Sequence, residues 1–127
     1  MARILLIDDD DLVRETIEAM LHYLNHTVVS APDGSDVVAL IRSFDPQLVI
    51  TDILMPGTEG IETTQVIMRH FPDMPVIAIS GATGLYAEYL DVATQFGARV
   101  TLQKPFSGED LRQALETCLA TGSGEAP

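Results

Sequence analysis

In the stretch Ile4-Leu5-Leu6-Ile7-Asp8-Asp9-Asp10-Asp11, a short apolar run leads directly into a row of acids. Such a run is typical of a strand that is buried on both faces of a parallel sheet. If further strands lie parallel to it, their carboxyl ends share one edge of the sheet, where open α/β sheets bind ligands. Three later runs have the same form: Leu48–Thr51 stops at Asp52, Val76–Ile79 stops at Ser80, and Val100–Gln103 stops at Lys104.

The segments between these runs carry apolar residues at helical spacing. These stripes cover residues 13–24, 37–44, 61–71, 86–96 and 111–119, and Val28-Val29 supplies a weaker strand after the first helix. Alternating strands and helices predict an α/β, doubly wound fold: a five-stranded parallel sheet with five helices on its two faces. The strongly apolar first, third and fourth strands suit the centre of the sheet, which matches a 2-1-3-4-5 order.

The length of the chain predicts its domain organisation. With 127 residues and a hydrophobic share of 46%, it is long enough for one domain with a substantial core. We expect residues 1–120 to form that domain. Residues 121–127 are polar and contain Gly and Ser, so we expect a flexible tail or the start of a linker.

The charge balance excludes several classes of partner. The chain has 7 basic and 19 acidic residues and a formal net charge of −12, which argues against direct nucleic-acid binding and against docking on anionic membranes. A single cysteine, Cys118, cannot form an internal disulfide, and no stretch of the sequence is long enough to cross a bilayer. We therefore expect a cytoplasmic location.

The acids after the first and third strands form the candidate site. Asp10 or Asp11 is placed to cap the helix that follows, but capping does not require four acids in a row. Asp8, Asp9 and Asp52 would instead meet at one edge of the sheet. There they would offer the oxygen ligands that Mg²⁺ prefers in proteins.

Two further polar residues complete this constellation. The hydroxyl of Ser80 and the ammonium of Lys104 would lie beside the acids, and such a set suits a divalent cation next to a phosphoryl group. The Lys104–Pro105 bond is a candidate for cis geometry. Zinc is not expected, because the histidines are scattered and Cys118 is remote from the acids.

With these residues in view, the chain resembles the receiver domains of bacterial two-component response regulators, the CheY-like family. The resemblance covers about residues 3–120. It implies a flavodoxin-like fold, and the 2-1-3-4-5 order is partly supplied by it. The motifs that carry it stand in the family's order: Ile7-Asp8-Asp9, Asp52 with Met55-Pro56-Gly57 and Gly60, Ser80-Gly81, and Lys104-Pro105-Phe106.

The resemblance implies a phosphorylation-operated signalling switch. Asp52 would accept a phosphoryl group from a sensor histidine kinase or a phosphotransfer protein, in a Mg²⁺-dependent reaction. The modified domain would then bind a downstream effector domain or protein differently. The chain would not be an enzyme, apart from assisting its own phosphorylation and dephosphorylation.

The resemblance also implies roles for the neighbouring residues. Asp9, Asp52 and the backbone carbonyl of Leu54 would hold Mg²⁺, and Asp8 would act mainly through a bound water. Ser80 would donate a hydrogen bond to the phosphoryl group. Lys104 would pair with the same group, so that positive charge faces it from two sides.

One position departs from the family's pattern. Family members usually carry an aromatic residue three positions before the lysine, and this residue turns inward when the hydroxyl loop moves. The chain has Thr101 at that position. We expect phosphorylation to order residues 81–84 but to move the surface of the fourth and fifth helices less than is usual.

Three other functions are compatible with parts of the pattern. An aspartyl phosphohydrolase would need a second carboxylate two positions after Asp52, where Leu54 stands. A flavin or nucleotide carrier would need a Gly-rich or hydroxyl-rich phosphate loop after the first strand, where the acids stand. A receiver-like interaction module that is never phosphorylated would have no use for an intact set of acids, hydroxyl and lysine.

Overall fold

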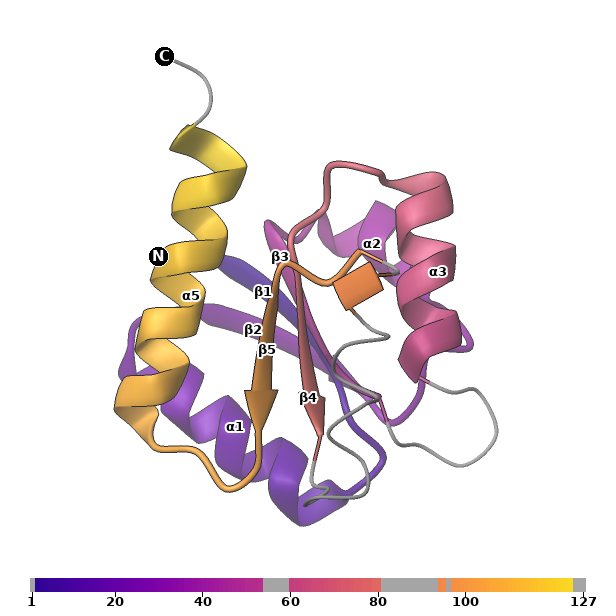
Figure 1. Ribbon diagram of the computed structural model, residues 1–127. Coiled ribbons are helices and arrows are strands. Elements are labelled where there is room, and N and C mark those ends of the chain that lie inside the picture. Colours follow the sequence, from indigo (N-terminus) through magenta and orange to yellow (C-terminus); the bar gives the residue numbers. More distant parts are fainter. Residues whose placement is uncertain (1, 54–59, 81–93, 96, 125–127) are drawn as a thin grey trace.

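The computed structural model describes residues 2–53, 60–80, 94–95 and 97–124. Its strands form one parallel sheet in the order β2-β1-β3-β4-β5 (Figure 1). This finding confirms the predicted strand order. The strands are β1 (Arg3–Ile7), β2 (Thr27–Ala31), β3 (Leu48–Asp52), β4 (Val76–Ser80) and β5 (Val100–Gln103).

Burial separates the central strands from the edges as the sequence predicted. Apart from Arg3 at the start of β1, every residue of β1, β3 and β4 is buried. The residues of β2 and β5 are half-buried or exposed. The apolar runs are continuous in the central strands because both of their faces are covered.

Helices cover both faces of the sheet (Figure 1). The described helices are α1 (Asp11–Tyr23), α2 (Val37–Phe44), α3 (Gly60–His70) and α5 (Gly108–Gly124). In Figure 1, α1 and α5 lie on one face, and α2 and α3 lie on the other. The fourth helix that the sequence predicts, within residues 86–96, falls largely outside the described residues.

Alternate residues of the central strands feed two separate cores, since successive side chains of a strand point to opposite faces. On one face, Ile4, Leu6, Ile50 and Ile77 pack with Ile17 and Leu21 of α1 and with Leu111 and Leu115 of α5. On the other, Leu5, Ile7, Val49 and Ala78 pack with Val37 and Ile41 of α2 and Ile67 of α3. The two cores hold the strand ends, and hence the acids, in a fixed arrangement.

The last helix has a well-defined start and extends beyond residue 120, where we expected the domain to end. The Ser107 amide donates to Asp110 Oδ2 at 3.1 Å, and the Asp110 amide donates to Ser107 Oγ at 3.0 Å. This reciprocal pair caps the start of the helix. The helix then continues through Gly124, past residue 120. Once a helix exists, each added residue gains a hydrogen bond, so a glycine need not end it.

Candidate functional site

The acids of the first and third strands meet at the carboxyl edge of the sheet. Ile7 pairs with Thr51 in the parallel register of β1 and β3, so Asp8 and Asp52 are neighbours. Ligand oxygens of Asp8, Asp9 and Asp52 all lie within 4.8 Å of one another. Asp8 is fully buried and Asp52 is 4% exposed, whereas Asp9 is exposed to solvent. The topology therefore brings together the three carboxylates that the sequence singled out.

Lys104 connects two of these carboxylates. Its Nζ donates to Asp8 Oδ2 at 3.1 Å and to Asp52 Oδ2 at 3.0 Å. Burial desolvates the ammonium and by itself lowers its pKa, but the charges and hydrogen bonds of Asp52 and Asp8 outweigh this effect. The pKa of Lys104 therefore lies above its ordinary value. The ammonium stays protonated and offsets part of the negative charge of the cluster.

Asp8 is fixed at its backbone and at both of its carboxylate oxygens. Its amide donates to the carbonyl oxygen of Ala31 in β2 at 3.1 Å. Its Oδ1 accepts from the amide of Asp10 at 3.0 Å, and its Oδ2 accepts from Lys104. Such a carboxylate is held in one orientation, as expected for a structural member of an ion site.

The other acids of the row have the roles that the sequence left open. Asp10 is the N-cap of α1, since its Oδ1 accepts from the amide of Val13 at 3.1 Å. Asp11 lies in the first turn and pairs with Arg14. The capping role predicted for one of these two acids is thus taken by Asp10. Asp9 is left as the exposed carboxylate of the cluster.

Arg14 is a member of this neighbourhood that the sequence analysis missed. Its Nη1 donates to the backbone carbonyl oxygen of Asp8 at 2.7 Å, and its Nη2 contacts Asp11. The side chain is 17% exposed, which is low for an arginine near a helix start. The available signal was its spacing of three residues from Asp11, which places the two side chains on one face of the helix.

Ser80 lies at the same edge of the sheet. It is the last residue of β4 and is 1% exposed, and its carbonyl oxygen accepts from the Lys104 amide at 2.7 Å. The Lys104–Pro105 peptide bond is cis, as predicted. Leu54, Met55-Pro56-Gly57 and residues 81–84 lie outside the described residues. The ligand role expected of the Leu54 carbonyl therefore stays a prediction.

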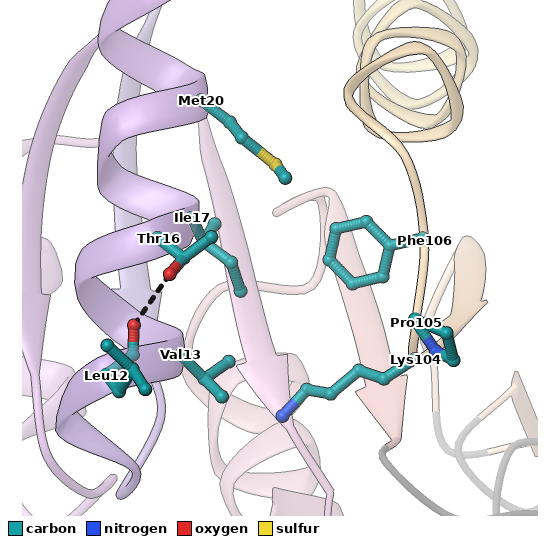
Figure 2. Close-up of a pocket in the computed structure, with 8 residues that line it drawn as sticks. All are labelled: Leu12, Val13, Thr16, Ile17, Met20, Lys104, Pro105 and Phe106. Carbon is teal, nitrogen blue, oxygen red and sulfur yellow. Dashed lines mark hydrogen bonds between the residues drawn. The ribbon is translucent and has the colours of Figure 1, made fainter.

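An apolar hollow adjoins the acids (Figure 2). It has a volume of about 300 Å³ and lies between α1 and the segment after β5. The aliphatic stem of Lys104 runs along it, and the Phe106 ring faces α1. The methylene groups of Lys104 therefore line the hollow, while its ammonium donates hydrogen bonds to Asp8 and Asp52. The lining residues are Leu12, Val13, Thr16, Ile17, Met20, Lys104, Pro105 and Phe106.

The donor set fits a hard divalent cation. Asp8, Asp9 and Asp52 form the one group of potential metal ligands found within the described residues, and it offers oxygen only. Oxygen ligands suit Mg²⁺, which keeps several waters and binds through a few carboxylates. Cys118 lies in the core on α5, where burial raises the pKa of its thiol to about 11 against the opposing charge of Arg99. It takes no part in this site.

A comparison of the sequence with protein families gives one match that spans most of the chain. The model of the response regulator receiver domain matches residues 4–116. The chain is 33% identical over 116 residues to the protein PilG of Pseudomonas aeruginosa, covering 90% of this chain and 84% of PilG. It is 35% identical to the probable C4-dicarboxylate response regulator DctR of Bacillus subtilis, of which it spans 50%.

Solved structures show the same relationship. A CheY-like receiver domain protein from Methanospirillum hungatei superposes with a TM-score of 0.89 at 25% identity, with 99% of each chain covered. NtrX from Brucella abortus gives a TM-score of 0.91 at 29% identity, where the match covers 98% of this chain and 28% of NtrX. Several relatives are therefore longer proteins that contain a domain of this kind.

Proposed function

The chain belongs to the response regulator receiver domain family, and on that premise we propose that Asp52 is its phosphoacceptor. Receiver domains are the phosphorylation-operated switches of two-component systems. The observation that carries the assignment is the pair of contacts from Lys104 Nζ to Asp52 at 3.0 Å and to Asp8 at 3.1 Å, beside exposed Asp9. This arrangement supports Asp52 as the acceptor, because its carboxylate lies between the Lys104 ammonium and a potential metal site.

We propose that the phosphoryl donor is a phosphohistidine of a sensor kinase or a phosphotransfer protein. A carboxylate oxygen of Asp52 forms the bond to phosphorus while the bond from phosphorus to the imidazole nitrogen breaks. Lys104 remains charged and faces the transferred group. Ser80, at the end of the neighbouring strand, is the proposed hydroxyl donor to it. The protein supplies position and charge, and little covalent chemistry beyond the acceptor oxygen.

Asp9 and Asp52, with the carbonyl of Leu54, are the proposed Mg²⁺ ligands, and Asp8 acts through water. Both Asp8 oxygens already accept from protein donors, which supports an indirect role. When bound, Mg²⁺ would neutralise charge that develops on the transferred group. The chain is not proposed to turn over a substrate, and a cytoplasmic location remains a prediction from its cysteine usage. No described helix is both long and apolar enough to cross a membrane.

The relatives named above include response regulators about twice the length of this chain, so a downstream effector domain or protein is the proposed target of the switch. The rival functions gain no support from the site. Buried Asp8, held by Lys104, occupies the place after β1 where a flavin or nucleotide carrier needs a phosphate loop.

The test is phosphorylation of the intact chain by a small acyl phosphate with Mg²⁺, followed by mass spectrometry and mapping of the modified residue. Asp52→Asn should abolish labelling, because the amide cannot act as the acceptor. Asp36→Asn, a change at the exposed N-cap residue of α2, should label like the unmodified protein. Equal labelling of Asp52→Asn and the unmodified protein would show that the acceptor is another residue.

A further inference from the structure

Asp9 differs from the other two carboxylates of the cluster. Asp8 and Asp52 are both held by Lys104, whereas the Asp9 carboxylate has no hydrogen bond or ion pair among the described residues. It is also the exposed member of the three. The position of this carboxylate therefore depends on its backbone and not on side-chain contacts.

The peptide units on both sides of Asp9 are held. The carbonyl oxygen of the Asp8–Asp9 peptide accepts from Arg14 Nη1 at 2.7 Å. The N–H of the Asp9–Asp10 peptide donates to Asp8 Oδ1 at 3.0 Å. Each peptide unit is planar, so a hydrogen bond at one of its polar atoms restricts the orientation of the whole unit up to the next Cα. Together the two bonds set the backbone direction on either side of the Asp9 Cα.

Arg14 is held in place both at its backbone and at its guanidinium group. Its amide donates to the carbonyl oxygen of Asp10 at 2.9 Å, which places it on the first turns of α1. One arm of its guanidinium reaches back to Asp8 while the other contacts Asp11. The planar fork of an arginine serves two acceptors in fixed directions, which the single ammonium of a lysine does not. Arg14 thus ties the end of β1 to the start of α1 across the acid row.

We propose that Arg14 is a positioning residue that presets Asp9 for a divalent cation; this inference rests on the proposed Mg²⁺ site. Its positive charge would by itself disfavour a nearby cation, since like charges repel. Positioning and charge therefore have opposite effects on Mg²⁺ affinity, and a charge-preserving substitution separates them. Arg14→Lys keeps the charge and loses the two-armed geometry.

The experiment is a titration of the intact chain with Mg²⁺ alone, followed by NMR signals of the folded protein. Arg14→Lys should raise the dissociation constant for Mg²⁺ about tenfold, the low end of what loss of an outer-shell contact does to a metal site. Arg42→Lys makes the same exchange at an exposed position on α2 and should leave the affinity unchanged. An Arg14→Lys protein that binds Mg²⁺ as tightly as Arg42→Lys would overturn the proposal.

A second pair of variants removes the other anchor of the guanidinium. Asp11→Ala and Glu15→Ala each delete one exposed acid from the start of α1, so both weaken cation binding through charge. Only Asp11→Ala also releases Arg14, and it should weaken binding further. Equal losses in the two variants would contradict the positioning role.

Two reference measurements separate this inference from the proposed function. Asp9→Asn should remove most of the Mg²⁺ response, and adding Arg14→Lys to it should have no further effect, because the residues act together. No Mg²⁺ response in the unmodified protein, or no loss in Asp9→Asn, rejects the metal site and the inference with it. If the unmodified protein and Arg14→Lys bind Mg²⁺ equally well and only Asp9→Asn fails to bind it, the role of Arg14 is rejected. The proposed metal site is then retained.

Discussion

Lys104 is the only lysine of the chain, and its ammonium is shared by two carboxylates of the site. Its side chain is 19% exposed, while Asp8 is fully buried. Removing one partner of a buried charge pair is strongly destabilising, because the remaining charge is left without compensation. The stability of the domain and the chemistry of the site therefore depend on the same residue.

Lys104→Met should lower the free energy of unfolding by about 3 kcal/mol in Mg²⁺-free buffer. Methionine keeps an apolar stem in the hollow beside α1 but removes the ammonium that lies between Asp8 and Asp52. Mg²⁺ should restore part of the loss, because a bound cation replaces the missing charge. Urea unfolding with and without Mg²⁺ measures both effects.

The control for this change is Arg42→Met, which removes a cation from an exposed site on α2. It should alter the free energy of unfolding by less than about 0.5 kcal/mol. If Lys104→Met were no less stable than Arg42→Met, the ion pairs would be of little energetic importance.

Single residues divide into those that the sequence could locate and those that it could not. Asp8, Asp52 and Ser80 were located because each ends an apolar run, and parallel strands bring such ends together. Arg14 was missed because its contact with the Asp8 carbonyl depends on the fold of the β1–α1 turn. The sequence around a charged residue at an exposed helix start does not indicate such a contact.

At the scale of elements, the approach of α2 to α3 is set by Gly34. This buried glycine precedes α2, and a Cβ built on it would lie 2.1 Å from Thr63 Oγ1 of α3. Thr63 is 1% exposed, so its side chain has little space to move away. The close packing of these two helices supports the face of the sheet that carries Leu5 and Ile7.

Gly34→Ala should therefore lower the free energy of unfolding by about 2 kcal/mol, because the methyl group forces the two segments apart. Gly108→Ala is the matched control, since a Cβ at Gly108 meets nothing within 4 Å. It should be neutral or stabilising by roughly 0.5 kcal/mol. Thermal unfolding of the two variants gives the comparison, and equal midpoints would argue against a tight contact at Gly34.

The elements themselves were largely predictable, with errors at their ends. Continuous apolar runs identified β1, β3 and β4, and the stripe from Val13 to Leu24 identified the face of α1 that packs on the core. The end of α5 was placed too early, because glycine and serine in residues 121–124 suggested a linker. Composition reports what a segment prefers in isolation, whereas a helix that is already formed can extend through it.

At the scale of the whole molecule, we expect Thr101 to limit how strongly the site communicates with the rest of the domain. It is half-buried in the edge strand β5 and pairs with Ala78 of β4. A change at one place moves another only through groups whose contacts differ between two states. A threonine offers a small side chain for this purpose where the family usually has an aromatic ring.

Binding of beryllium fluoride, a phosphoryl mimic, should therefore shift NMR signals near Asp52 and Lys104 but change those of α5 only slightly. Thr101→Tyr restores an aromatic ring and should enlarge the changes along β5 and α5. Large, uniform changes along α5 in the unmodified protein would show that communication does not need the ring.

The position of Lys104 also has a practical consequence for anyone who labels or immobilises the protein. Succinimidyl esters and similar acylating reagents find one side-chain amine in the entire sequence, and it is the one clamped between Asp8 and Asp52. A dye, biotin tag or sensor-chip linkage attached there would remove the positive charge that Asp8 and Asp52 share. Conjugates made through this amine should therefore lack the two ion pairs that hold Asp8 and Asp52.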